Sequence, residues 1–438
     1  MTEYSKVAGT LGSRPGRTIL RAALMLGALT AGLTACVPVV DPRSTVADDH
    51  PSQGPIYAGP LVITRGGTYR GNWQSFDPQV AAVTIRTSEP VVIENSVLRG
   101  RGSLIRGNEV NLTVRNTTGY GLNPLTNGEY PGRFLAVVTA LDLLIENNDM
   151  QGTSGIYINL FKGNVKTGQT IKILRNRIRN LDGRIVNQQG KFTGKRHYVQ
   201  AVQFNKIARV PNVEIAWNEV INEPGQSAVE DNISIYESSG TPTSPIRIHD
   251  NYIHGAYSAT PLKAKSYSGG GILLGDGRKD SMDIAGGYVD VYRNQVINTS
   301  NHGVGIAGGH HQRVYDNRIV STGLLPDDVI DPNANVGVYV WNINGSAAGN
   351  ARTFTDNVVE KNVIGWRRFD SKGEVYYHNL WTPSCLASSG NVCKDNESWP
   401  VPLDDDVEAK EFARWQEKLR EAKVVVGVRG TSTSAGTP

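Results

Sequence analysis

The chain repeats a short phrase in which an asparagine has aliphatic residues on both sides. VYRNQVI at 291–297 and VYDNRIV at 314–320 are two clear copies, 23 residues apart. A unit of this size cannot bury its own apolar face, so neighbouring units must stack on one another. The phrase therefore restricts the chain to a repeat architecture. The central asparagines of all copies, weaker ones included, are Asn95, Asn116, Asn148, Asn176, Asn218, Asn251, Asn294, Asn317, Asn362 and Asn379.

A second alternating stretch lies between many of these asparagines. Alternation of apolar and polar residues predicts short strands with one set of side chains pointing inward. If the strands stack in parallel, about 4.8 Å apart, the asparagines of successive coils form a hydrogen-bonded ladder at one corner. Leucine-rich repeats are one rival architecture, but the irregular gaps and the mainly Ile and Val inward positions suit a horseshoe poorly. A propeller is the other, but it needs four strands per roughly 40–45 residues, and the gap from Asn294 to Asn317 is too short for that. The stretches are GIYIN (155–159), AVQFN (201–205), NISIYE (232–237), GILLGD (271–276), GVGIAG (303–308) and GVYVWN (337–342).

Over about residues 58–382, this ladder of phrases resembles the right-handed parallel β-helix superfamily with the pectate-lyase-like fold. The resemblance implies an all-β solenoid, a right-handed parallel β-helix of about ten coils. After Trp381 the pattern stops. Residues 403–423 begin with acidic and end with basic side chains, as a helix dipole favours. For residues 383–438 we expect a disulfide loop, a short C-terminal helix on the end or flank of the β-helix, and a disordered tail.

The first residues have the pattern of an export signal. A basic stretch ending at Arg21 precedes the apolar run AALMLGALTAGLTA at 22–35 and then Cys36. LTAC at 33–36 resembles the lipobox of bacterial lipoproteins, which implies a signal peptide over 1–35, lipidation of Cys36 and a polar tether over 36–57. The protein would then lie in the bacterial cell envelope, lipid-anchored on the outer face of a membrane. An ordinary signal peptide with a chance cysteine is the alternative.

Two cysteines remain after Cys36 is set aside. Cys385 and Cys393 lie eight residues apart in a loop rich in Ser, Gly and Asn. In an exported protein we expect them to form one disulfide bond, with two free thiols as the alternative. The net charge of +4 falls to +1 without the first 35 residues, so bulk charge predicts no nucleic-acid partner. We expect a monomer.

Polar residues precede several strands at equal positions. Glu230 and Asp231 precede one strand, Gly270 the next and His302 the one after that. Asp231 and His302 should lie two coils, roughly 10 Å, apart, with the glycine leaving room for a ligand. A carboxylate and an imidazole around an open groove suit acid and base catalysis on a glycosidic bond.

The other ends of these strands carry a different set of charges. Lys206, Glu237 and Asp276 are expected on three successive coils. Two neighbouring carboxylates repel one another unless a cation lies between them, so Glu237 and Asp276 predict a Ca²⁺ site. Lys206, Arg278 and Lys279 could meet the carboxylates of an acidic sugar polymer. The resemblance to polysaccharide lyases with this fold implies a basic side chain that removes a proton, for which Lys206 is a candidate.

Outward strand positions also carry aromatic and amide side chains that could bind substrate. These are Tyr157, Gln203, Tyr236, Tyr339 and Trp341. Exposed rings along a groove suit the apolar faces of sugars, although such rings can also simply cover the coil.

Together these features favour an exported, lipid-anchored protein that binds an extended, acidic polysaccharide along the lateral groove of a β-helix. If it is an enzyme, cleavage by β-elimination is favoured over hydrolysis, with Asp231, His302, Lys206 and Glu230 as catalytic candidates. The alternative is a non-catalytic cell-envelope scaffold, or a lipoprotein that binds glycan or protein. No complete catalytic motif decides between them.

Overall fold

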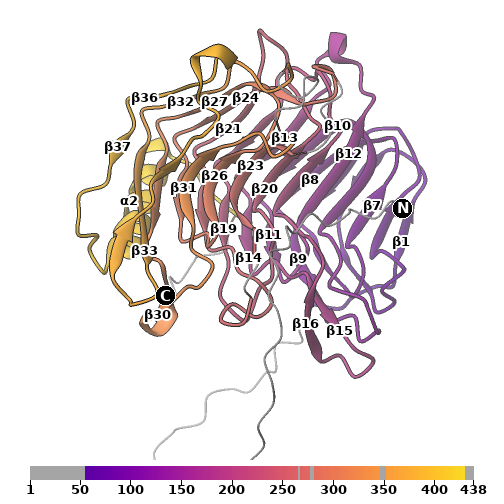
Figure 1. Ribbon diagram of the computed structural model, residues 1–438. Helices are drawn as coiled ribbons and strands as arrows, with labels where there is room; N and C mark the ends of the chain where they lie inside the picture. The colour runs from indigo at the N-terminus through magenta and orange to yellow at the C-terminus, as the bar shows by residue number, and fades with distance from the viewer. Residues whose placement is uncertain (1–54, 265–266, 277–280, 346–351, 430–438) are drawn as a thin grey trace, which may run out of the picture. The chain divides into compact units, whose positions relative to one another are not determined.

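The computed structural model describes residues 55–264, 267–276, 281–345 and 352–429, and within them the chain is a parallel β-helix (Figure 1). Each coil contributes a strand to each of three faces in turn. The long strand β10 (Leu135–Glu146) belongs to two faces, because its first half pairs with β12 and its second half with β13. The predicted all-β fold class with one C-terminal helix is confirmed.

Face 1 comprises β1 (Leu61–Ile63), β4 (Val83–Ile85), β7 (Ile105–Gly107), the first half of β10, β12 (Ile156–Phe161), β17 (Val202–Asn205), β20 (Ile233–Tyr236), β23 (Gly270–Asp276), β26 (His302–Ile306), β31 (Val336–Val340) and β35 (Leu380–Trp381). Face 2 comprises β2 (Gly67–Tyr69), β5 (Val91–Glu94), β8 (Val110–Arg115), the second half of β10, β13 (Ile171–Leu174), β18 (Glu214–Ala216), β21 (Ile246–His249), β24 (Gly287–Tyr292), β27 (His310–Tyr315), β32 (Val358–Glu360) and β36 (Val392–Lys394). Face 3 comprises β3 (Asn72–Ser75), β6 (Val97–Gly100), β9 (Thr118–Gly121), β11 (Asp149–Gln151), β14 (Arg177–Arg179), β19 (Glu219–Ile221), β22 (Tyr252–His254), β25 (Gln295–Ile297), β28 (Arg318–Ser321), β33 (Val363–Phe369) and β37 (Glu397–Ser398).

Short elements lie at the corners between faces. The corner that leads from face 3 to face 1 carries the antiparallel hairpin of β15 and β16, which stands beside the first coils of face 1 (Figure 1). Insertions gather there because a corner lies outside the strand pairing that holds the coils together. The short elements are β15 (Arg184–Val186), β16 (Phe192–Arg196), β29 (Leu324–Leu325), β30 (Val329–Ile330), β34 (Val375–Tyr377) and the 3-10 turns η1 (Val165–Thr167), η2 (Pro326–Asp328) and η3 (Ala387–Ser389).

The predicted asparagine ladder forms the corner between faces 2 and 3. Each Nδ2 donates a hydrogen bond of 2.9–3.0 Å to Oδ1 of the next member. A residue with left-handed backbone precedes each member. In two early coils Asn95 and Asn116 occupy that left-handed position themselves, with φ of 49° and 47°, so the expectation that they join the ladder is wrong. The members are Asn148, Asn176, Asn218, Asn251, Asn294, Asn317, Asn362 and Asn396.

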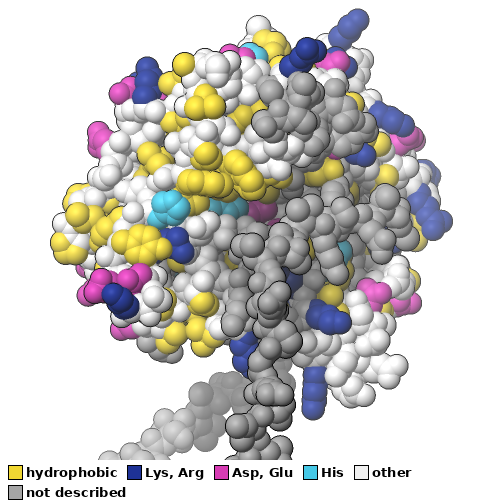
Figure 2. All heavy atoms as spheres, viewed as in Figure 1, with side chains coloured by type: hydrophobic (Ala, Val, Ile, Leu, Met, Phe, Trp, Pro, Cys, Tyr) yellow, Lys and Arg dark blue, Asp and Glu magenta, His cyan; other side chains and the backbone are white. Residues whose placement is uncertain are grey.

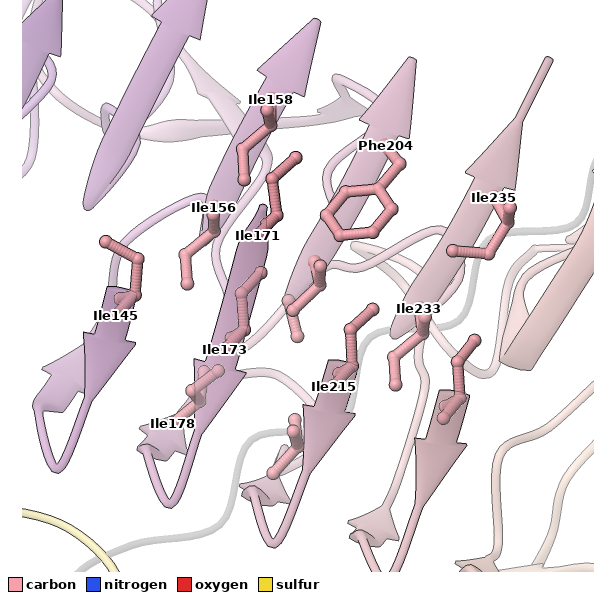
Figure 3. Packing of buried hydrophobic residues seen from close by; sticks show 14 of the residues in the cluster. Ile145, Ile156, Ile158, Ile171, Ile173, Ile178, Phe204, Ile215, Ile233 and Ile235 are labelled. Carbon is pink, nitrogen blue, oxygen red and sulfur yellow. The ribbon is translucent and has the colours of Figure 1, made fainter. Parts of the chain in front are cut away.

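Inward positions of all three faces form one continuous core. Aliphatic side chains of consecutive coils stack on one another in rows, as Figure 3 shows for Ile145, Ile173 and Ile215 on face 2. Ile156 and Ile233 belong to one row of face 1, with one coil between them. All five are fully buried. The rows explain why a unit that is too small to fold alone is stable within the stack.

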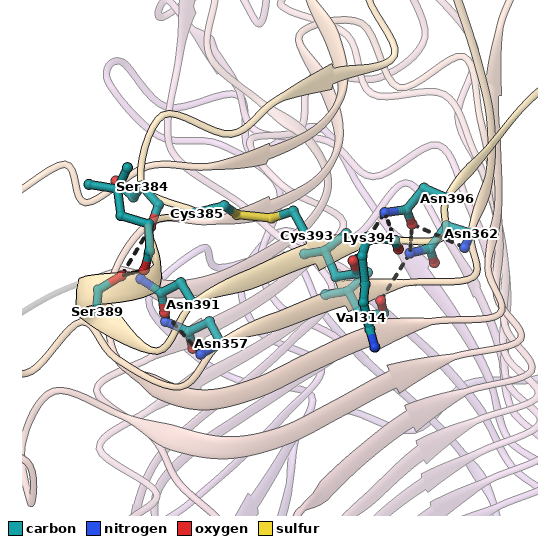
Figure 4. The surroundings of a disulfide bond; sticks show 12 residues. Val314, Asn357, Asn362, Ser384, Cys385, Ser389, Asn391, Cys393, Lys394 and Asn396 are labelled. Carbon is teal, nitrogen blue, oxygen red and sulfur yellow. Dashed lines mark hydrogen bonds between the residues drawn. A yellow bond between two sulfur atoms is a disulfide. The ribbon is translucent and has the colours of Figure 1, made fainter.

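The β-helix extends beyond residue 382, where we expected it to end. β36 pairs with β32 and β37 pairs with β33, and Asn396, not Asn379, is the last described member of the ladder. Asn379 instead accepts a hydrogen bond from the backbone of Trp366. The Cys385–Cys393 disulfide closes a loop inside this last coil (Figure 4).

The C-terminal helix α2 (Val407–Ala422) packs on the outer side of face 3, which is one of the two positions we expected. Trp415 is fully buried against Tyr252 and Trp217, and its indole Nε1 donates to Glu219. Arg318 holds Glu411 of the helix in a bidentate ion pair. The helix therefore covers face 3 from β19 to β28 and leaves face 1 free of it. Within the described ranges, none of the helices combines the length and apolar character needed to cross a bilayer.

Candidate functional site

The predicted site residues lie mainly on the outer side of face 1. Tyr157, Gln203, Ser234, Leu273 and Gly305 occupy equal positions on five successive coils, and Tyr339 and Trp381 continue the row. Figure 2 shows hydrophobic and histidine side chains gathered on this face over β26 and β31. From β12 to β35 the row crosses six strand spacings, roughly 29 Å.

Asp231 and His302 contact one another directly. His302 Nε2 lies 3.5 Å from Asp231 Oδ1, and Gly270, between them, donates its N–H to the same oxygen at 3.0 Å. A Cβ on Gly270 would lie 2.6 Å from the His302 ring. The glycine therefore makes room for the imidazole of the next coil, and the prediction that it makes room for a ligand is wrong.

Burial also changes the chemistry of this pair. His302 is 1% exposed and Asp231 is 4% exposed. Burial lowers the pKa of His302 to about 4, so its imidazole is neutral near pH 7. A neutral, enclosed imidazole cannot meet a glycosidic bond in an open groove in the way that acid and base catalysis requires.

The other two catalytic candidates, Glu230 and Lys206, are not placed for acid and base catalysis either. Glu230 forms an ion pair with Arg196 of the hairpin and accepts a hydrogen bond from Ser268 at 2.9 Å. Lys206 is exposed in the turn after β17, whereas Glu230 precedes β20. The length of a four-residue strand, roughly 13 Å, separates their levels. The structure does not bring Lys206 together with Asp231, Glu230 or His302.

The proposed calcium ligands are out of register. Tyr236, not Glu237, pairs with Asp276, because Gly275 forms a bulge with φ of +71°. Glu237 is 5% exposed and lies one position further along the chain. The side chain of Asp276, together with Arg278 and Lys279, falls outside the described residues. Among the described residues no three His, Cys, Asp or Glu side chains are grouped to hold a metal ion, so the calcium site stays a prediction.

Aromatic side chains form two groups on face 1. Tyr157 lies at the end nearer the N-terminus, where its hydroxyl accepts a hydrogen bond of 3.0 Å from Asn205. At the other end Trp341 and Trp381 are 43% and 40% exposed, with ring centroids 5.3 Å apart, and Tyr339 lies 6.5 Å from Trp381. Tyr236 occupies the neighbouring outward row, at the level of Asn205. Trp381 is a member that the sequence pattern did not indicate.

The residue that sequence reasoning missed is Arg133, in the segment before β10. Its Nη1 donates to the carbonyl of Ser154 at 2.8 Å. Its Nη2 is 3.3 Å from Gln203 Oε1 and 3.5 Å from Gln200 Oε1, and its guanidinium lies 5.4 Å from the centre of the Tyr157 ring. All these partners are neutral. No repeat pattern covers the segment, so only the fold brings Arg133 to the row.

Arg133 lacks the acidic partner that comparable arginines have. Arg175, Arg184 and Arg196 are each paired with a carboxylate. For Arg133, no Asp or Glu of the described chain lies within ion-pairing distance. Burial lowers its pKa, which means that the surroundings already disfavour the charge. A half-buried guanidinium with a planar set of donors and no counterion is suited to bind a carboxylate in two-point geometry.

Tyr130 and His197 form the side of this site. Their rings stack with centroids 4.2 Å apart, and they join the loop before Arg133 to the chain that follows the hairpin. Burial, with a smaller effect of the Arg133 charge, lowers the pKa of His197. His197 therefore adds no positive charge beside Arg133 near pH 7.

The fold places this chain in the class of parallel β-helix proteins, and its candidate site lies on a lateral face of the helix. No protein-family model matches the chain, and no curated protein matches it. Among solved structures it is similar to the Dettilon tailspike protein, with 13% identity, a TM-score of 0.39 and coverage of 78% of this chain and 61% of that chain. It is also similar to a PL6 family polysaccharide lyase from Pseudopedobacter saltans, with 11% identity, a TM-score of 0.36 and coverage of 87% and 97%. A mannuronic acid specific family 6 lyase from human gut microbiota gives 10% identity, a TM-score of 0.31 and coverage of 84% and 91%. Function must come from the site itself.

Proposed function

We propose that the protein binds an extended acidic polysaccharide along face 1, with one sugar carboxylate held by Arg133. The observation that carries this proposal is the half-buried guanidinium without an acidic partner, beside Tyr157, Gln200 and Gln203. A carboxylate would replace weak contacts to amide oxygens with charge-assisted hydrogen bonds. Amide side chains at the same place can bind sugar hydroxyl groups.

The rest of face 1 supports a long ligand. Trp341 and Trp381 expose their rings at the far end of a face roughly 29 Å long, where sugar rings can stack on them. The polymer would lie across the strands, because the outward row runs from coil to coil. An anchor at each end gives specificity for an extended chain over a single sugar.

Binding without cleavage is the function that these side chains support. Asp231 and His302 are enclosed, and Glu230 is neutralised by Arg196. None of the three is an accessible acid or base. β-Elimination and hydrolysis therefore enter as readouts of the experiment below and not as part of the proposal.

The cellular location is part of the proposal. The apolar run that precedes Cys36 supports export and lipidation, although Cys36 itself lies outside the described residues. A lipid anchor there would hold face 1 near the glycans of a cell envelope. Replacement of Cys36 by serine should move the protein from the membrane fraction to the soluble fraction, and an unchanged distribution would contradict the anchor.

The test compares a polyuronate with the same polymer after its carboxyl groups have been reduced. Wild-type protein should bind the first and bind the second at least about tenfold more weakly, as the loss of a charged hydrogen-bond partner predicts. Arg133→Gln should reduce the difference between the two polymers. Arg133→Lys keeps the positive charge but not the planar pair of donors. It should therefore keep only part of the wild-type preference for the polyuronate. Unsaturated products and new reducing ends are measured in the same samples.

A matched control comes from face 2. Arg313 also lies over a tyrosine ring, that of Tyr315 at 4.8 Å, and Arg313→Gln changes the net charge equally. That variant should bind as the wild type does. Equal affinity of the two polymers for wild-type protein, or an equal loss in both variants, would refute the proposal. Product formation would show that the protein is an enzyme.

A further inference from the structure

A cleft of about 580 Å³ lies on the other side of the corner from Arg133. Arg133 donates to the carbonyl of Ser154, whose hydroxyl donates to the carbonyl of Pro131 and lies 3.3 Å from that of Asp182. Pro131 and Asp182 line the cleft. One layer of backbone therefore separates it from the Arg133 site, and its volume falls within the range of ordinary ligand sites.

Aromatic rings are open to solvent in this cleft. Tyr120 of β9 is 40% exposed and Phe192 of β16 is 46% exposed, and both line it together with Tyr57. One wall thus belongs to face 3 and another to the hairpin β15–β16. Exposed rings in a concave, polar site are suited to stack against the apolar faces of sugar rings.

The cleft also carries an uncompensated positive charge. Arg184 is held by Asp182 through two hydrogen bonds of 2.9 Å, so that pair is internally neutral. Arg99 donates to Gln74 at 2.7 Å and lies 4.0 Å from the centre of the Tyr57 ring. No carboxylate of the described residues pairs with Arg99. An anionic group of a ligand would supply that partner.

Neutral hydrogen-bonding groups complete the lining. The side-chain amides of Gln151 and Gln226 face solvent and make no hydrogen bond with any described residue. Each offers one acceptor and two donor hydrogens to hydroxyl groups.

The geometry points to a second carbohydrate site, which takes a short acidic oligosaccharide. Its sugar rings stack on Tyr120 and Phe192, one carboxylate binds Arg99, and hydroxyl groups bind Gln151 and Gln226. The lining residues of the cleft support this second site by themselves, whereas the expectation that it binds the same polymer as face 1 rests on the proposed function. Binding on both sides of the corner would let one protein hold two polymer segments.

Calorimetric titration of a uronic acid trisaccharide into the whole protein tests this inference. Two sites per chain are expected. Arg99→Gln and Tyr120→Ala should each weaken one of them about 10- to 100-fold, as the loss of a charged hydrogen bond or a stacked ring predicts, and leave the other unchanged. Arg133→Gln should weaken the site on face 1 and leave the cleft unchanged. Arg101→Gln, the same charge change two positions from Arg99 and outside the cleft lining, is the control and should leave both sites intact.

The outcomes separate the two proposals. A single site that is lost in Arg133→Gln and unaffected by Arg99→Gln and Tyr120→Ala overturns the cleft and leaves the proposed function standing. A single site that is lost in the two cleft variants only supports the cleft, and the polyuronate experiment then decides the proposed function separately. Equal binding of the carboxyl-reduced trisaccharide at the cleft overturns the role of Arg99. Melting temperatures equal to that of the wild type would show that all variants are folded.

Discussion

Truncation of one ladder asparagine in the middle of the stack should strongly destabilise the protein. Asn218 is 2% exposed, and its side chain makes four hydrogen bonds. Its Oδ1 accepts from the backbone N–H and from Nδ2 of Asn176 at 3.0 and 2.9 Å. Its Nδ2 donates to the carbonyl of Ile173 at 2.9 Å and to Asn251 at 3.0 Å.

Asn218→Ala leaves buried groups without partners. The backbone N–H of Asn176 and the carbonyl of Ile173 lose their hydrogen bonds in a place that water cannot reach. Each orphaned group costs about 1–3 kcal/mol, so the free energy of unfolding should fall by about 3–5 kcal/mol. Urea denaturation of the purified protein measures this change.

Asn396, at the end of the ladder, provides the matched comparison. It also makes four hydrogen bonds, with Asn362, Val359 and Lys394, but it is only half-buried. Water can replace its side chain, so Asn396→Ala should cost about 1–2 kcal/mol. If the two variants lost equal free energy within about 0.5 kcal/mol, the argument from buried, unsatisfied groups would be refuted.

Three further predictions concern two charged groups and the helix. Burial alone would lower the pKa of His249, but hydrogen bonds to Asp250 at 2.7 Å and Glu214 at 2.9 Å outweigh it and raise that pKa above its usual 6.5. His249 should therefore contribute its full stabilisation of the folded state below about pH 6.5. The free energy of unfolding should fall as the pH rises through the raised pKa of His249. His249→Gln should flatten the profile there, and an unchanged slope would exclude His249 as its source. The hydrogen bond from His249 is the largest cause that lowers the pKa of Glu214 to about 2, so a second loss of stability should occur between about pH 4.5 and 2. Trp415→Ala should cost about 3–5 kcal/mol, because a fully buried indole and its hydrogen bond to Glu219 are lost, and a loss below about 1 kcal/mol would show that α2 contributes little.

The candidate site was predictable only where strand periodicity reached it. Tyr157, Gln203 and Tyr339 share one outward row because strand alternation is strict. Alternation places a residue on a face but does not give the direction in which its side chain leans. His302 leans over Gly270 toward Asp231, and this contact converts two expected catalytic groups into a buried pair.

A single irregular residue was enough to break the alignment of strand ends. Glu237 and Asp276 hold equal positions in the sequence repeats, but the bulge at Gly275 shifts one strand by a residue. A bulge leaves no unambiguous trace in a repeat that is already rich in glycine.

The sequence by itself determined the architecture of this protein. A repeated asparagine phrase between aliphatic residues requires stacking, since one coil cannot bury its own apolar side chains. Membership of the ladder depended on one further local choice, whether an asparagine or its neighbour takes the left-handed backbone, as Asn116 and Asn148 show. Only the tertiary structure decided which charges remain without partners. Arg133 comes from a segment with no sequence signal, and Arg99 from the strand that follows the Asn95 phrase. The difference between these two arginines and the paired Arg184 depends on which carboxylates the folded coils bring within a few ångströms.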